Sequence, residues 1–278
     1  MSKIKFSAFA DEVTSDFQGQ VKFLVDQDVP AIEIRFVDNK NIMDLTKKEL
    51  EKTRKILLDN GISVSAIGSP IGKVSLQEPF NKHLDKFKHA IELANYFDTP
   101  FIRVFSYYAP EGENIDNYRE EVVERISRQA ELLQNTEIVM VHENEADIYG
   151  HSAKNCADLA KAVNSPAFGL AYDPANFVWG EKITNNMEKC WPLMEPYVVH
   201  VHIKDWGLGN TVGSLPGEGD GQIKQLLSEL NKKKYNGFLT MEPHLRVGGQ
   251  FGGETGPELF YDALEATRTI CSEVGLSY

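Results

Sequence analysis

The stretch VVHVHIKDWG, residues 198–207, joins an apolar strand pattern to a run of ionisable side chains. Its valines are β-branched, and such residues favour a buried strand that is covered on both faces. Burying the polar side chains that alternate with and follow them, among them His202 and Lys204, is costly unless each has a partner. The stretch therefore predicts a buried strand whose carboxyl end opens into a polar site.

Similar apolar runs recur along the whole chain and alternate with segments of helical period. Strands are predicted at residues 4–10, 31–37, 62–68, 101–107, 137–143, 168–174, 198–204 and 237–243. Clear amphipathic helices are predicted at residues 46–59, 81–97, 117–134, 222–230 and 257–273, and a less regular one near 184–195 contains Pro192.

Eight strand–helix units without a break in composition predict one (β/α)₈ TIM barrel domain over residues 1–278. A doubly wound open sheet is the alternative. It would be expected to carry a glycine-rich turn after its first strand, and the sequence there, FADEVTSDF (9–17), has none.

The composition bounds the class of protein. The 278 residues carry 29 basic and 41 acidic side chains, a net charge of −12, which disfavours a protein that grips nucleic acid phosphates. The apolar runs are too short to span a membrane, and the N-terminal MSKIKFSAF has no apolar signal core. Three widely spaced cysteines without a pairing motif indicate a reducing compartment. We therefore expect a cytoplasmic protein without nucleic acid or membrane partners.

Four polar residues end four consecutive predicted strands. They are Glu143 in MVHENE, Asp173 in LAYDPAN, His202 in VHVHIKD and Glu242 in LTMEPH. In a barrel the carboxyl ends of the strands meet at one rim, so these side chains converge. Three carboxylates and one imidazole suit Mn²⁺, Mg²⁺, Co²⁺ or Zn²⁺, and without a cation the carboxylates would raise one another's pKa values. The pattern predicts a site for one divalent metal ion, and this ion would be the partner that the buried His202 needs.

Five segments resemble the sugar phosphate isomerase/epimerase family of xylose-isomerase-like barrels, in order and in spacing. They are HENEADIYG (142–150), YDPANF (172–177), HVHIKD (200–205), GEGDG (217–221) and MEPHL (241–245). The resemblance covers nearly the entire chain and implies a (β/α)₈ barrel with one metal ion held by Glu143, Asp173, His202 and Glu242. Members include ketose 3-epimerases, hydroxypyruvate isomerases, inosose dehydratases and dehydroshikimate dehydratases, with apurinic-site endonucleases more distant. Members are often dimers or tetramers, so by analogy we expect a homo-oligomer.

Proton transfer next to a carbonyl fits this residue set. The resulting enediolate has two adjacent oxygens, which a divalent ion can hold while it stabilises the developing charge. Epimerisation also needs a base on one face of the carbon and an acid on the other, and we assign these roles to Glu143 and Glu242. Lys204 follows His202 by two residues and so points the same way, toward an enolate oxygen or a substrate phosphate.

Four further residues are candidate contacts to a sugar or keto-polyol substrate. Glu33 forms either such a contact or a buried ion pair inside the barrel. Asn176 stands where many ketose 3-epimerases have a histidine, which weakens the transfer of their substrate contacts. His244 is expected either to hydrogen-bond the substrate or to orient Glu242. Trp206 directly follows the seventh strand and is placed to form a pocket wall.

Neighbouring polar residues have other expected roles. We expect His200 to pack in a second layer and His142 to point away from Glu143, because strand side chains alternate. Phe9 is a weak candidate for a pocket wall. The glycine-rich loop 207–221 is expected to present backbone N–H groups to the substrate.

The sequence favours a metal-dependent isomerase or epimerase, and three rivals remain. A dehydratase begins with the same proton abstraction, so the sequence does not separate the two. An apurinic-site endonuclease would need more metal ligands and a basic groove. A non-catalytic sugar-binding barrel would be expected to show a damaged ligand set, and all four positions are intact.

Overall fold

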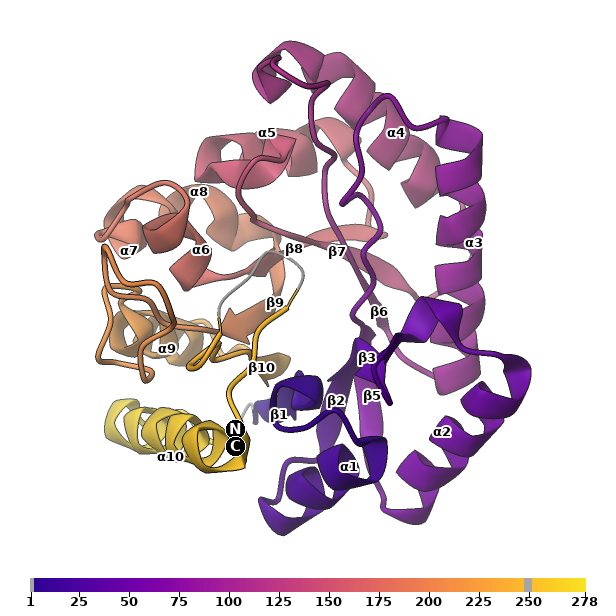
Figure 1. The fold of residues 1–278 in the computed structure, drawn as a ribbon. Helices are drawn as coiled ribbons and strands as arrows, with labels where there is room; N and C mark the ends of the chain where they lie inside the picture. Colours follow the sequence, from indigo (N-terminus) through magenta and orange to yellow (C-terminus); the bar gives the residue numbers. More distant parts are fainter. Residues whose placement is uncertain (1–2, 248–251) are drawn as a thin grey trace.

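The computed structural model describes residues 3–247 and 252–278 and contains a ring of eight parallel strands (Figure 1). The strands of the ring are β1 Lys5–Ala8, β2 Ala31–Ile34, β5 Ser63–Ile67, β6 Phe101–Val104, β7 Val139–Glu143, β8 Phe168–Tyr172, β9 Val198–Ile203 and β10 Phe238–Met241. They are hydrogen-bonded in the order β1-β10-β9-β8-β7-β6-β5-β2, so the two ends of the sheet are consecutive in sequence. This nearly closed barrel confirms the predicted (β/α)₈ fold class.

Helices surround the strands as an outer layer (Figure 1). They are α1 Phe17–Asp26, α2 Lys47–Asp59, α3 Phe80–Phe97, α4 Arg119–Glu131, α5 Ala153–Val163, α6 Pro174–Trp179, α7 Asn186–Lys189, α8 Trp191–Met194, α9 Ile223–Lys232 and α10 Pro257–Val274. Helix α2 begins at a capping box between Thr46 and Glu49, which satisfies backbone N–H groups that would otherwise lack partners. None of the helices in the described residues has both the length and the apolar character needed to cross a bilayer.

Two of the predicted elements take a different form in the structure, and helices α1 and α5 were not among the predicted ones. The second strand stops at Ile34, and the rest of its predicted range forms a small hairpin between β3 Phe36–Val37 and β4 Lys40–Asn41. The segment near 184–195 forms the short helices α7 and α8 with Pro192 at the start of α8, because proline lacks the N–H that would continue α7. Both differences leave the order of barrel strands unchanged.

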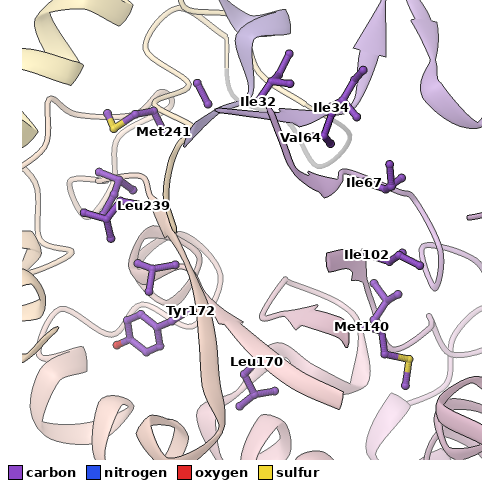
Figure 2. Close-up of a cluster of buried hydrophobic side chains, with 14 of the residues drawn as sticks. Ile32, Ile34, Val64, Ile67, Ile102, Met140, Leu170, Tyr172, Leu239 and Met241 are labelled. Atoms are coloured by element: carbon purple, nitrogen blue, oxygen red, sulfur yellow. The ribbon is translucent and has the colours of Figure 1, made fainter. Parts of the chain in front are cut away.

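The alternation of side chains along each strand separates an apolar layer from a polar one. Figure 2 shows residues such as Ile32, Met140 and Leu239 pointing outward from the strands, where the helices cover them. The intervening positions point into the barrel, and many are polar. Ser7 and Ser65 are hydrogen-bonded across it at 2.6 Å. The core that stabilises the fold therefore lies between strands and helices, and the barrel interior is free to carry chemistry.

Candidate metal centre and substrate pocket

The four predicted metal ligands converge at the carboxyl rim of the barrel. Glu143 ends β7 and His202 lies near the end of β9, whereas Asp173 and Glu242 directly follow β8 and β10. One nitrogen or oxygen atom from each lies within 4.8 Å of the others, and all four side chains are buried. Alternation along adjacent parallel strands places all four on the inner face, which is why residues so far apart in sequence meet.

Asp173 is held so that only one of its oxygens faces the cluster. Its Oδ1 caps helix α6 by accepting hydrogen bonds from the backbone N–H groups of Ala175 at 2.9 Å and Asn176 at 3.1 Å. Asn144 bonds the Asp173 backbone in both directions, at 2.8 and 3.0 Å. The Asp173 Oδ2 has no hydrogen-bond partner in the described residues and lies 2.7 Å from the Lys204 ammonium.

His202 presents one ring nitrogen to the cluster and the other to a buried carboxylate. Its Nε2 donates to Glu33 Oε2 at 3.3 Å, which leaves Nδ1 to face Glu143 at 3.2 Å and Glu242 at 3.6 Å. Burial opposes a charge there, but Glu143 and Glu33 raise the pKa of His202 well above its usual value. The carboxylates that stabilise a proton on His202 would also stabilise a metal cation, and a metal ion bound at Nδ1 would take the place of that proton. The residues therefore fit a divalent ion.

Glu33 lies inside the barrel beneath the cluster and does not line the pocket. Its Oε2 accepts hydrogen bonds from His200 at 2.7 Å and from His202, and His200 also contacts the Thr240 hydroxyl at 3.1 Å. Burial raises the pKa of Glu33, but the two histidines outweigh it and hold this pKa well below the usual value. The position gives no support to a substrate contact from Glu33. It instead fits a carboxylate that orients the ligand His202, with His200 packed in the second layer as expected.

Two other groups of possible ligands overlap the four-residue set. Glu33, His200 and His202 form one, but Glu33 Oε2 already accepts hydrogen bonds from both histidines, and Glu33 and His200 do not line the pocket. Glu12, Glu242 and His244 form the other. The Arg35 guanidinium lies 3.7 Å from Glu12 and 2.9 Å from Glu242, so a cation already stands between those two carboxylates. The set of Glu143, Asp173, His202 and Glu242 offers four ligands instead of three, although Lys204 lies 2.7 Å from Asp173 and 3.5 Å from Glu242.

Neighbouring cations give the three carboxylates different pKa values. Burial would raise the pKa of Glu143, but His202 and Arg103 lower this pKa to about 2. Burial also opposes the charge of Glu242, but Lys204, His244 and Arg35 together lower its pKa well below the usual value. Burial raises the pKa of Asp173 to about 6, and Lys204 only partly opposes it. At neutral pH all three are ionised, and Asp173 is the first to take up a proton on acidification.

The cluster opens into a pocket whose far side is basic. Arg35 follows β2, Lys73 follows β5 and Arg103 lies on β6, and all three line the pocket. We call these three residues the cation wall. Arg103 lies 3.2 Å from Glu143, and Lys73 lies 3.1 Å from Glu145. Lys73 and Arg103 were not predicted as site residues, although an arginine in the otherwise apolar strand FIRVF (101–105) was a usable signal.

Three of the four predicted substrate contacts line the pocket, together with the proposed catalytic Lys204. Asn176, Trp206 and His244 do so, and Glu33 does not. Asn176 donates to the Asn144 carbonyl at 2.8 Å and lies 3.4 Å from Glu143. Contact of Asn176, Trp206 and His244 with a substrate stays a prediction, and their position in the pocket lining allows it.

Other expected positions can be read from the structure. His142 points away from Glu143 and is hydrogen-bonded to Ser106 at 2.9 Å. His244 lies 3.2 Å from Glu12, a buried carboxylate that sequence analysis did not single out. Phe9 is fully buried and packs edge-on against His202, so it supports the site from below.

Three glycines of the glycine-rich loop direct their N–H groups to an internal carboxylate and not to the pocket. The backbone N–H groups of Gly217, Gly219 and Gly221 donate to the buried carboxylate of Asp205 at 2.8, 3.1 and 2.8 Å. A Cβ at Gly219 would lie 2.4 Å from the Asp205 carboxylate, so glycine is required for this approach. These three glycines therefore do not fulfil the expectation, because a carboxylate inside the protein already accepts their donors, and for the rest of the loop it stays a prediction. The loop still contributes Thr211 to the pocket lining.

Comparisons with known proteins agree with this architecture. The family model described as xylose isomerase-like TIM barrel matches residues 21–270. No curated protein matches the chain. Similar solved structures include a D-psicose 3-epimerase in the presence of D-fructose, with 17% identity over 98% of this chain and 100% of that one and a TM-score of 0.75.

Two further solved structures are similar at comparable levels. A xylose isomerase-like TIM barrel protein from Mycobacterium smegmatis in complex with magnesium has 14% identity over 98% of both chains and a TM-score of 0.73. The probable 3-DHS dehydratase AsbF from Bacillus anthracis has 18% identity over 96% of this chain and 98% of that one, with a TM-score of 0.72. At these identities the likeness is one of fold, whereas the family model covers most of the sequence. The chain belongs to the xylose isomerase-like TIM barrel family.

Proposed function

We propose that the protein is a divalent-metal-dependent isomerase or epimerase that acts on a sugar or sugar phosphate through an enediolate. The observation that carries the proposal is the convergence of Glu143, Asp173, His202 and Glu242 at the mouth of the barrel. Asp173 Oδ2 and His202 Nδ1 are buried there without a hydrogen-bond partner in the described residues. Mn²⁺, Co²⁺, Mg²⁺ and Zn²⁺ are the candidate ions, and we propose a cytoplasmic location.

The proposed reaction uses Glu143 and Glu242 as base and acid. A bound divalent ion would act as a Lewis acid that stabilises the negative charge of the enediolate. Glu143 ends β7 and Glu242 follows β10, and both flank His202. Their low pKa values keep both ionised, so either can accept the proton from the carbon. In an isomerisation the carboxyl group that took the proton returns it to the neighbouring carbon, and in an epimerisation the opposite carboxylate delivers a proton that it has taken up from solvent. Lys204 lies 3.5 Å from Glu242 and lines the pocket, where its ammonium would stabilise an enolate oxygen.

A dehydratase acting on a keto-polyol is the second candidate. Loss of a hydroxyl next to the enolate needs a proton donor near the leaving oxygen. His244 lines the pocket, and Glu12 lies behind it at 3.2 Å, an arrangement that orients an imidazole for proton transfer. The likeness to the fold of a probable dehydratase is compatible with this candidate.

Proton exchange in heavy water tests both candidates on the metal-loaded protein. We expect at least one ketose or keto-polyol of a panel to exchange its carbon-bound proton, and Glu143→Gln or Glu242→Gln to abolish that exchange. Exchange with a change of configuration or carbonyl position supports the isomerase, whereas exchange with loss of water supports the dehydratase. If metal is bound but no member of the panel exchanges, the proposal fails and a non-catalytic sugar-binding barrel becomes the better account.

A further inference from the structure

The three cations of the cation wall pack against two aromatic rings. The guanidinium carbons of Arg35 and Arg103 lie 4.4 and 4.8 Å from the ring centre of Phe9. Arg103 is also 5.0 Å from the ring centre of Phe105, and the Lys73 ammonium is 4.3 Å from that ring. Contacts of this kind hold cations in place without using up their hydrogen-bond donors. The wall is therefore positioned by its aromatic neighbours.

Arg103 keeps a donor that no described residue accepts. Arg35 is 4% exposed and Arg103 is 5% exposed, so both are more than nine-tenths buried. The three nitrogens of Arg35 face carboxylates, with Nε 2.9 Å from Asp11, Nη1 2.9 Å from Glu242 and Nη2 3.7 Å from Glu12. The Nη1 of Arg103 donates to Glu143 Oε2 at 3.2 Å, whereas no described residue accepts from its Nη2, which is not one of the fully enclosed polar atoms. A cationic donor that lines the pocket in this way favours a ligand that accepts its hydrogen bond.

The acidic neighbours of the wall leave few acceptors for a substrate. Asp11 and Glu12 hold Arg35 from outside the pocket, at 2.9 and 3.7 Å, and do not line it. Of the carboxylates that do line the pocket, Glu143 and Glu242 belong to the proposed metal set and Glu145 is paired with Lys73. The wall itself presents only donors, because guanidinium and ammonium groups cannot accept a hydrogen bond.

A substrate group that complements this wall must accept hydrogen bonds and donate none. Each hydroxyl of a neutral sugar also carries a donor, and the nearest acceptors, Glu143 and Glu145, are already engaged by Arg103 and Lys73. A carboxylate or a phosphate has only acceptors and forms short, strong bonds with guanidinium groups. We propose that the cation wall binds an anionic group of the substrate, a carboxylate or a phosphate, next to the metal ligands. This inference rests on the proposed function and specifies its substrate class.

Paired titrations with charged and neutral ligands test the inference. Calorimetry on the metal-loaded protein compares D-fructose 6-phosphate with D-fructose, and shikimate with its methyl ester. We expect the anionic member of at least one pair to bind about tenfold more tightly or better, since one charge-assisted hydrogen bond supports such a difference. The phosphate pair and the carboxylate pair separate the two possible sources of the anion.

Two variants test whether the cation wall causes the preference for the anionic ligand. Lys73→Met and Arg103→Gln are each expected to reduce the affinity ratio of the anionic to the neutral ligand to less than about threefold, because each removes a charge-assisted donor. Lys88→Met is the control, since Lys88 lies on α3, is 53% exposed in its side chain and does not line the pocket. It removes the same charge and should leave the preference unchanged. Metal content is measured on every sample, so a variant that has lost its metal is recognised.

The outcomes separate this inference from the proposed function. Any of three results would overturn the anion site. They are equal binding of the charged and neutral ligand within both pairs, no binding of either anion at millimolar concentration, and an unchanged preference for the anion in both wall variants. Titration of the metal-free protein is the second arm, and we expect a weaker preference to persist there because the wall does not include a metal ligand. Absence of metal from the wild-type protein would contradict the proposed function and leave that second arm to decide on the wall.

Discussion

The two halves of the barrel rim carry opposite chemistry. Strands β7 to β10 deliver three carboxylates and an imidazole, whereas β2, β5 and β6, or the segments that follow them, deliver two arginines and a lysine backed by aromatic rings. The halves are coupled, because Arg103 contacts Glu143 and Arg35 contacts Glu242. The basic half, together with Lys204 after β9, therefore supplies the positive charge that allows the acidic half to be buried.

The largest expected effect is on stability, from removal of Arg35. Arg35→Met would leave Asp11, Glu12 and Glu242 buried without their guanidinium and should cost about 3–5 kcal/mol of unfolding free energy. Urea denaturation measures it. Added Mn²⁺ should recover part of the loss, because the ion would neutralise Glu242. Lys22→Met is the control, since its ion pair with Asp26 is exposed, and should cost less than about 1 kcal/mol. A loss for Arg35→Met no larger than that of the control would refute the coupling.

A smaller effect is expected on metal affinity from Glu33→Gln. The variant keeps the shape of the side chain but weakens the carboxylate that accepts from His202 Nε2 at 3.3 Å. Loss of such a supporting carboxylate should weaken Mn²⁺ binding by about 10–100-fold, as measured by calorimetry. Glu145→Gln serves as a matched control, because Glu145 lines the pocket but is paired with Lys73. Equal metal affinity in wild type and Glu33→Gln would remove Glu33 from the metal site.

Acid should weaken metal binding through Asp173. Burial raises the pKa of Asp173 to about 6, so a proton and a metal ion compete for its carboxylate as the pH falls through 6. Above about pH 7 a metal ion displaces only the proton of His202, whose pKa is raised, so Mn²⁺ affinity should change by about tenfold per pH unit there. Between pH 6 and pH 5 the ion also displaces the proton of Asp173, so the affinity should fall by more than tenfold, up to about a hundredfold. The arginines of the basic half stay charged throughout. A slope that does not steepen below pH 6 would show that Asp173 is not a ligand.

The smallest expected effect is that of Lys73→Met on metal affinity. Lys73 contacts Glu145 and the ring of Phe105, and neither is in the proposed metal set. Removing its positive charge should strengthen Mn²⁺ binding slightly, by less than about threefold, because a distant repulsion is relieved. A marked loss of metal affinity in this variant would place the cation wall within the metal site and remove the distinction between the two halves.

The acidic half of the rim could be predicted from the sequence, and the basic half only in small part. Strand alternation and one βα unit between ligands were enough to bring Asp173 and His202 together, because parallel strands fix their carboxyl ends at one rim. Arg103 sits in its strand without a motif around it, and Lys73 lies in a loop whose path no local pattern reports. The role of Glu33 needed the register across the barrel, which places it against two histidines.

Anomalous diffraction from crystals grown with Mn²⁺ tests the central claim most directly. The account predicts one manganese peak per chain, at bonding distance from His202 Nδ1 and from oxygens of Glu143, Asp173 and Glu242, and no peak in His202→Ala. A peak among Glu33, His200 and His202, or beside Glu12 and His244, would contradict the assignment, and so would the absence of any peak in the wild-type crystals.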